Sequence, residues 1–266
     1  MNAPPPGHGA RLWSLVVPAD DADDAADQLW RAGATAVVIE ERGSTVRLTT
    51  DVAPPGPTPL GWRRTPIDTD EAASGSWLEG LPPVRIGPWT IHRPELDVTV
   101  DGAVAIDPAR AFGSGHHPTT RLALEALGPL VGPGVRLLDV GCGSGVLAVA
   151  AAVGGARCTA LDVDPEAVAA TRANAARNGV ARRVDCVLGT VTAVRGDFDV
   201  VVANMLVPAI TACAANLAAA TRHGGVLVIT GVLENQAPQV QDALGLTERH
   251  RLAAGDWVGL VYDHRP

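Results

Sequence analysis

The stretch L-L-D-V-G-C-G-S-G-V-L, residues 137–147, decides the fold of this 266-residue chain. An apolar run of strand character, 135–140, leads into a turn that holds three glycines in five residues. The apolar, small-residue segment 146–153 that follows is typical of a buried helix. Glycine lets the backbone turn sharply and lets a ligand approach without meeting a Cβ atom. The helix start also offers unpaired N–H groups, so the stretch predicts a strand–turn–helix unit that binds a ligand.

Two acidic residues narrow the choice of ligand. The spacing G-x-G-x-G differs from the G-x-G-x-x-G of the dinucleotide fingerprint. Asp139 precedes the first glycine by two residues and suits an amino group better than a pyrophosphate, because like charges repel. Asp162 ends the next strand-like run, where a carboxylate can bind both hydroxyls of a ribose. A ribose joined to an amino acid without phosphate indicates S-adenosylmethionine (SAM), and a tight turn without any ligand is the alternative.

The chain beyond this stretch alternates strand and helix patterns separated by short loops. The apolar runs and helix-start signals predict strands at 135–140, 157–163, 183–188, 198–203, 225–231, 246–253 and 257–263, and helices at 145–153, 165–178, 208–221 and 234–244. This alternation predicts an α/β fold with a doubly wound, Rossmann-like parallel sheet. The last two strands predict a hairpin at the sheet edge, which is typical of the methyltransferase variant of this fold rather than of a dehydrogenase.

The first hundred residues predict a smaller module and a connection. Residues 1–10 are rich in Pro and Gly, with no apolar core for a signal peptide, and are expected to be a disordered tail. Residues 11–52 have a strand–helix–strand–strand pattern, the first part of a ferredoxin-like unit. Residues 53–97 carry many prolines together with Trp62, Trp77 and Trp89, and are expected to be a linker and inter-domain segment. Residues 98–266 then form the large domain.

The composition excludes several classes of function. The hydrophobic content of 47% supports a proper core, and all 21 basic residues are Arg, which excludes Schiff-base chemistry and a P-loop lysine. The net charge of −8 does not favour a nucleic-acid surface. No apolar run reaches the roughly 18 residues of a membrane span. The four cysteines are scattered, so we expect a reduced, cytoplasmic protein without a metal site.

Four segments carry a family resemblance: AFGSGHHPTT (111–120), LLDVGCGSGVLAVAA (137–151), LDVDPEAVAATRANAARNGV (161–180) and VVANMLVPAI (201–210). They resemble the ribosomal protein L11 methyltransferases. The resemblance implies a class I methyltransferase that uses SAM and methylates lysine side-chain and N-terminal amines of ribosomal protein L11. It also implies that the small N-terminal module recognises the substrate protein.

The resemblance also implies individual roles. The expected SAM contacts are Thr120, Gly141, Asp162 and Asn204, with a flap of Phe112, Gly113 and Gly115 beside the methionine end of the cofactor. The residues of the glycine turn add Asp139 and Gly143 to the cofactor site. Asn204 is also the expected catalytic residue, because it ends the fourth strand, where its side-chain carbonyl can orient the amine.

Several points stay open at this level. Met205 stands where the family usually carries Ile or Leu, and the stretch from Asn204 to Val207 lacks the aromatic of the N-P-P-Y motif, which favours an aliphatic amine. His116 and His117 titrate in the range of a general base, or they hydrogen-bond the cofactor or their own loop. The substrate could instead be another protein or a small amine. A nucleotide-binding dehydrogenase or a non-catalytic binding module is the alternative from a different class.

Overall fold

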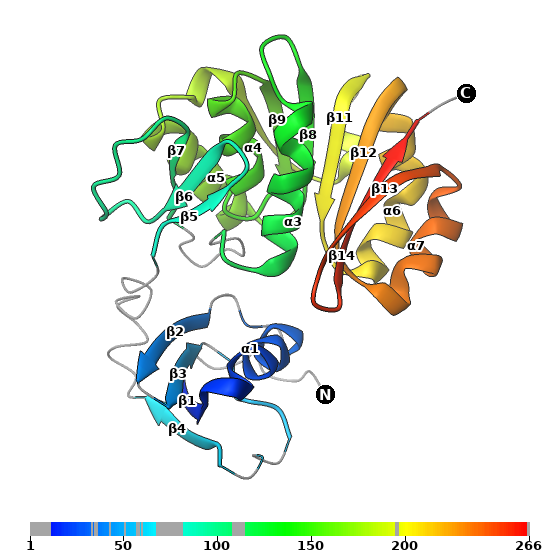
Figure 1. Cartoon of the computed structure of the whole chain (residues 1–266). Helices are drawn as coiled ribbons and strands as arrows, with labels where there is room; N and C mark the ends of the chain where they lie inside the picture. Colours follow the sequence, from blue (N-terminus) through cyan, green and yellow to red (C-terminus); the bar gives the residue numbers. More distant parts are fainter. Residues whose placement is uncertain are drawn as a thin grey trace, which may run out of the picture. The chain divides into compact units, whose positions relative to one another are not determined.

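The computed structural model describes residues 12–32, 34, 37–42, 44–50, 52–56, 59, 61–67, 82–107, 115–194 and 197–264. The chain divides into two compact units, Met1–Pro82 and Pro83–Pro266, both drawn in Figure 1. The expected tail at 1–10 and Trp77 lie outside the described residues.

The first unit is a four-stranded antiparallel sheet with one described helix. Its elements are β1 (Leu12–Pro18), α1 (Ala22–Arg31), β2 (Val37–Arg42), β3 (Thr45–Thr50) and β4 (Arg63–Ile67). The strand order is β2-β3-β1-β4, and alternate residues of β3 are buried, as expected for a sheet with one covered face. Leu29 of α1 packs with Leu15 and Leu48 of the sheet to form this unit's core.

The expected linker and inter-domain segment, residues 53–97, contributes strands to both units. β4 pairs antiparallel with β1, which extends the first sheet beyond residue 52. In the second unit, β5 (Val84–Ile86) and β6 (Trp89–His92) form a small sheet with β7 (Ala103–Ala105). Trp62 donates to Asp21 within the first unit, whereas Trp89 is 1% exposed in the core of the second. These two tryptophans therefore each pack inside one unit.

The second unit is built on a seven-stranded sheet of order β10-β9-β8-β11-β12-β14-β13. Its strands are β8 (Arg136–Val140), β9 (Arg157–Asp162), β10 (Val184–Leu188), β11 (Phe198–Asn204), β12 (Thr221–Leu233), β13 (Thr247–Ala254) and β14 (Trp257–Asp263). Its helices are α3 (Pro118–Leu127), α4 (Val146–Val153), α5 (Pro165–Arg177), α6 (Val207–Ala220) and α7 (Ala237–Leu244). The expected α/β fold is confirmed, and so is the closing hairpin, since β14 pairs antiparallel with both β12 and β13.

Apolar residues on both faces of the sheet explain the continuous apolar runs in the sequence. Leu137 and Val202 point to the face covered by α3, α4 and α5, and their neighbours Leu138 and Ala203 point to the face covered by α6 and α7. Figure 1 shows α4 and α5 on one side of the strands and α6 and α7 on the other. The strand order reverses between β8 and β11, which in open α/β sheets is where ligands bind. Within the described residues, no helix combines the length and apolar character needed to cross a membrane.

A substitution at Gly231 tests how tightly the end of β12 is packed. It has a φ of +84°, and a Cβ atom there would lie 2.3 Å from the carbonyl oxygen of Met205. We expect Gly231→Ala to lower the free energy of unfolding by about 2 kcal/mol more than Gly245→Ala, measured by urea denaturation. Gly245 is the matched control, because its φ is also positive at +63° while a Cβ atom added there would meet nothing within 4 Å. Equal losses in the two variants would show that the contact with Met205 contributes nothing.

Candidate functional site

Three of the expected site residues lie at equivalent positions at the ends of three adjacent strands of the sheet. Val140 of β8 is in register with Leu161 of β9 and with Ala203 of β11. The next residue on each strand is therefore Gly141, Asp162 or Asn204, at the carboxyl edge of the sheet. Strand pairing thus brings together a glycine turn, a carboxylate and an amide that are far apart in the sequence.

The glycine turn is held by backbone hydrogen bonds. The N–H groups of Gly141 and Cys142 both donate to the carbonyl of Leu161, at 2.9 and 3.0 Å, and Gly145 donates to Cys142 at 2.7 Å. Gly141, Gly143 and Gly145 all have positive φ angles, of 74°, 53° and 80°. Such angles strain any residue with a Cβ atom, so the three glycines are required by the course of the backbone.

Asp162 braces the turn from the end of β9. One carboxylate oxygen accepts the N–H of Gly143 and the other accepts the N–H of Asp164, each at 3.0 Å. The side chain is half-buried, and each carboxylate oxygen keeps lone-pair capacity for a further donor. Asp162 is therefore fixed in position and still able to accept from a pair of hydroxyl groups.

Asp139 lies beneath the glycine turn. It is 1% exposed, and its Oδ2 accepts the N–H of Ala148 in α4 at 3.1 Å. Its Oδ1 is buried with no hydrogen-bond partner among the described residues. Burial raises the pKa of Asp139 from 3.8 to about 7, the bond from Ala148 opposes this, and the charge of Asp162 adds to it. A buried carboxylate oxygen without a donor is a place where a cation or an N–H group would be stabilised.

Asn204 and Thr120 are brought into contact. Nδ2 of Asn204 donates to the hydroxyl of Thr120 at 3.3 Å, across 84 residues of sequence. Thr120 is fully buried in the first turn of α3, and Asn204 is half-buried at the end of β11. This bond fixes the plane of the Asn204 amide at the edge of the sheet.

His117 is part of the helix structure rather than an exposed base. It is the N-cap of α3, where its Nδ1 accepts the N–H of Thr119 at 3.2 Å, and its ring meets the edge of Trp257 at 5.3 Å between centroids. Burial lowers the pKa of His117 to about 4. The imidazole is therefore neutral at physiological pH, and the N–H bond uses its Nδ1 as an acceptor.

Gly115 has a structural reason to be glycine. Its φ is +89°, and a Cβ atom there would lie 2.6 Å from Cγ2 of Ile91 in β6. The expected partners of Gly115 in the flap, Phe112 and Gly113, lie outside the described residues.

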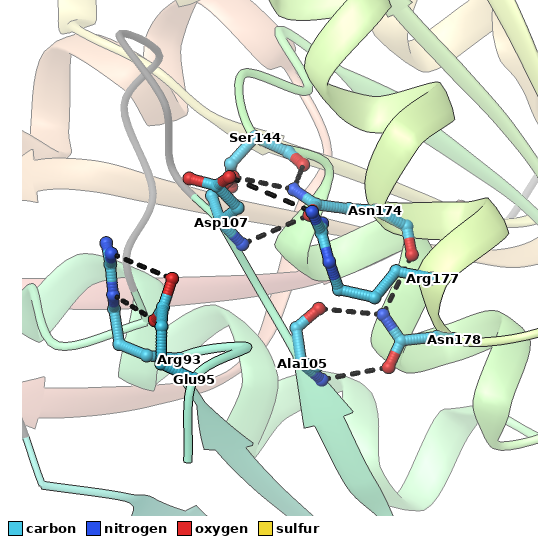
Figure 2. Close-up of polar contacts among 8 residues, drawn as sticks. All are labelled: Arg93, Glu95, Ala105, Asp107, Ser144, Asn174, Arg177 and Asn178. Carbon is cyan, nitrogen blue, oxygen red and sulfur yellow. Dashed lines mark hydrogen bonds and ion pairs between the residues drawn. The ribbon is translucent and has the colours of Figure 1, made fainter.

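Two polar residues of α5 that the sequence analysis did not single out also reach the glycine turn. The hydroxyl of Thr171 donates to the carbonyl of Gly143 at 3.1 Å, and Nδ2 of Asn174 donates to the carbonyl of Ser144 at 2.8 Å (Figure 2 shows the second bond). Both side chains are at most 1% exposed. The sequence pattern that could have indicated them is their spacing, because Thr171 and Asn174 recur at helical intervals with Val168 and Ala175 on the buried face of α5.

Exposed apolar side chains border the same edge of the sheet. Val163 follows β9, Leu188 ends β10 and Leu206 follows β11, and they are 69%, 56% and 72% exposed. Large apolar groups exposed next to convergent polar groups are typical of a ligand site. The edge therefore offers a carboxylate for hydroxyls, an unpaired buried carboxylate oxygen, a glycine turn without Cβ atoms and apolar surface for a ring. This set of groups fits a nucleoside that carries an amino acid, such as SAM.

Comparison with known proteins agrees with this chemistry. The model of a family described as ribosomal protein L11 methyltransferase (PrmA) matches residues 67–265. A ribosomal protein L11 methyltransferase of Deinococcus radiodurans is 38% identical over 228 residues, which cover 82% of this chain and 83% of the relative. One from Thermus thermophilus is 39% identical over 201 residues, covering 73% and 78%. The crystal structure of a ribosomal protein L11 methylase from Lactobacillus delbrueckii subsp. bulgaricus matches with a TM-score of 0.62 and 30% identity, covering 67% of this chain and 96% of that one.

The buried state of His117 predicts a pH dependence of stability. Its pKa is about 4 in the folded chain and 6.5 in the unfolded chain, so between these values only the unfolded chain binds the proton. Stability is lost as the pH falls through this window. Between about pH 7.5 and about pH 4.5 we expect wild type to lose about 2 kcal/mol more than His117→Asn, which keeps an N-cap acceptor. Urea denaturation at both pH values measures this, and parallel losses would place the imidazole in water. The raised pKa of Asp139 acts in the opposite sense in both proteins and cancels in the difference.

Proposed function

Because the chain belongs to the ribosomal protein L11 methyltransferase family, we propose that it transfers methyl groups from SAM to amino groups of ribosomal protein L11. The observation that carries the proposal is the convergence of Gly141, Asp162 and Asn204 at the carboxyl edge of the sheet. A nucleotide-binding dehydrogenase is not consistent with this family membership, and the antiparallel β14 gives the sheet its methyltransferase form.

The glycine turn and Asp162 are proposed to hold the nucleoside part of the cofactor. Asp162 would accept from the two ribose hydroxyls, since its carboxylate is already oriented by Gly143 and Asp164. Gly141 and Gly143 would let the cofactor lie against the backbone. The exposed side chains of Val163 and Leu188 offer apolar surface on which the adenine ring can pack.

The amino-acid end of the cofactor is proposed to lie on the side of the turn where Asp139 and Thr120 are found. Asp139 is proposed to stabilise the cofactor's amino group, because its Oδ1 is buried without a donor among the described residues. Thr120, Phe112, Gly113 and Gly115 remain proposed contacts for the methionine portion. Thr120 would act mainly through Asn204, since its side chain is fully buried.

Bound SAM supplies an electrophilic methyl group on a sulfonium, and the protein has to align a neutral amine with it. Asn204 is the proposed catalytic residue. Because its Nδ2 is bonded to Thr120, its Oδ1 is the side-chain atom able to accept a hydrogen bond from the amine and orient the nitrogen lone pair. His117 does not serve as the general base in this proposal, since Nδ1 caps α3 and burial lowers its pKa.

The organisation of the chain suggests where the substrate protein binds. We propose that the first unit recognises L11, and that this unit includes β4 as well as residues 11–52. The second unit, with β5 and β6 added to the expected range 98–266, would carry out the transfer. We propose that the protein acts in the cytoplasm and does not bind nucleic acid directly, which is consistent with four unpaired cysteines among the described residues and a net charge of −8.

Removing the carboxylate of Asp162 tests the cofactor site. We expect Asp162→Ala to weaken SAM binding by about 1–3 kcal/mol, measured by calorimetry, because the charge-assisted bonds to ribose are lost. Asp185→Ala is the control, since Asp185 is exposed in the neighbouring strand β10 and the charge change is the same. An affinity that stays at the wild-type value in Asp162→Ala would place the ribose elsewhere.

Incubation of purified ribosomal protein L11 with the protein and SAM tests the reaction itself. We expect mass spectrometry to find added methyl groups on L11 lysines or its N-terminal amine. Asn204→Ala should slow the transfer by about tenfold or more at saturating SAM, because the amine is no longer oriented. Asn216→Ala, an exposed position on α6, should react at the wild-type rate. Methylation of a different protein or of a small amine, with L11 unchanged, would replace the substrate in this proposal.

A further inference from the structure

One face of α5 carries a row of polar side chains that bond to backbone groups of other segments. Thr171 donates to the Gly143 carbonyl at 3.1 Å, and Asn174 donates to the Ser144 carbonyl at 2.8 Å. Asn174 also pairs with the backbone of Asp107, accepting its N–H at 3.0 Å and donating to its carbonyl at 2.8 Å. Asn178 pairs with the backbone of Ala105 in the same way, with both bonds at 2.8 Å. Figure 2 shows the two asparagines side by side along the segment from Ala105 to Asp107.

Both asparagines hydrogen-bond to the backbone of the segment from Ala105 to Asp107, but they differ in their bonds to the glycine turn. Of the two, Asn174 reaches a carbonyl of the turn, and it is 1% exposed. Asn178 instead donates its second N–H to the carbonyl of Asn174 within α5. Arg177 adds an ion pair with Asp107 at 3.8 Å and a hydrogen bond to Asn174. The helix therefore clamps one segment through both asparagines and holds the cofactor turn through Thr171 and Asn174.

Holding these two carbonyls sets the direction of the peptide planes in the turn. In a trans peptide the C=O and the following N–H point in opposite directions. Fixing the Gly143 and Ser144 carbonyls toward α5 therefore turns the N–H groups of Ser144 and Gly145 away from α5. The turn and α5 lie so close together that Gly145 has no room for a side chain, because a Cβ atom there would lie 2.6 Å from Cγ2 of Thr171.

We propose that Thr171 and Asn174 are positioning residues for cofactor binding, which hold the glycine turn in its binding conformation through the carbonyls of Gly143 and Ser144. This inference rests on the proposed SAM site. It assigns to α5 a role in affinity for the cofactor in addition to its role in packing. Neither side chain needs to touch the cofactor, since both act through the backbone of the turn.

The first test compares two substitutions of Thr171 by calorimetric titration with SAM. Thr171→Val nearly keeps the shape but removes the hydroxyl, with its contacts to the Gly143 carbonyl and to Sγ of Cys142 at 3.3 Å. We expect it to raise the Kd about tenfold. Thr171→Ser keeps the hydroxyl and should bind within about twofold of wild type. Binding weakened equally in both would trace the effect to packing and overturn the proposal for Thr171.

The second test compares the same substitution at Asn174 in α5 and at Asn178, the C-cap of α5. Asn174→Asp keeps an acceptor for the Asp107 N–H and for Arg177 but replaces the donor to the Ser144 and Asp107 carbonyls with an acceptor. Asn178→Asp loses the donors to the Ala105 and Asn174 carbonyls but changes no bond to the turn. We expect about a tenfold or greater rise in the Kd for Asn174→Asp and less than twofold for Asn178→Asp. Equal changes in Kd would mean that both act through stability and would overturn the proposal.

The outcomes separate this inference from the proposed function. If Asp162→Ala weakens SAM binding while Thr171→Val and Asn174→Asp bind as wild type, the SAM site stands and the role of α5 is refuted. If wild type itself binds no SAM, both fail together. Steady-state kinetics supply an independent readout, because a residue that positions the turn should raise the KM for SAM more than it lowers kcat.

Discussion

The carbonyl of Leu161 accepts the N–H groups of both Gly141 and Cys142, and the rest of the site depends on this pairing. It ties the loop after β8 to the end of β9, so that the next residue of β9, Asp162, stands beside Gly143. The turn is then closed from the opposite side by α5, and the buried Asp139 supports the start of α4 from below. A turn with three left-handed glycines has little conformational preference of its own, so its shape comes from these surrounding bonds.

The sequence was informative where a local pattern and the fold demanded the same residue. The glycine turn, the carboxylate at the end of β9 and the alternation of strands and helices are local signals, and the order of the strands follows from the fold class. β4 was not predicted because Arg-Arg-Thr-Pro-Ile has neither alternation nor an apolar face, and only its pairing with β1 makes it a strand. β5 and β6 lie in the segment expected as a linker, and their membership of the second unit depends on long-range packing around Trp89 and Ile91.

Side-chain contacts across long sequence separations were the harder part of the site. Asn204 and Thr120 were each expected near the cofactor, yet their mutual bond follows only from placing α3 beside β11. Thr171 and Asn174 have no sequence signature apart from polarity on a buried helical face. From the sequence, His117 was open as a general base or as a residue that hydrogen-bonds the cofactor or its own loop, and in the structure it is buried and caps α3.

The arrangement of the last two strands has a consequence for how the chain is made. Among the described strands, β13 pairs only with β14, and β14 is also the partner of β12 on that side. During synthesis β13 leaves the ribosome before β14, so it has no edge to join until the hairpin is complete. Until then β12 presents unpaired backbone groups to other nascent chains, the kind of edge on which aggregation begins. The hairpin therefore completes this edge of the sheet only after both of its strands have left the ribosome.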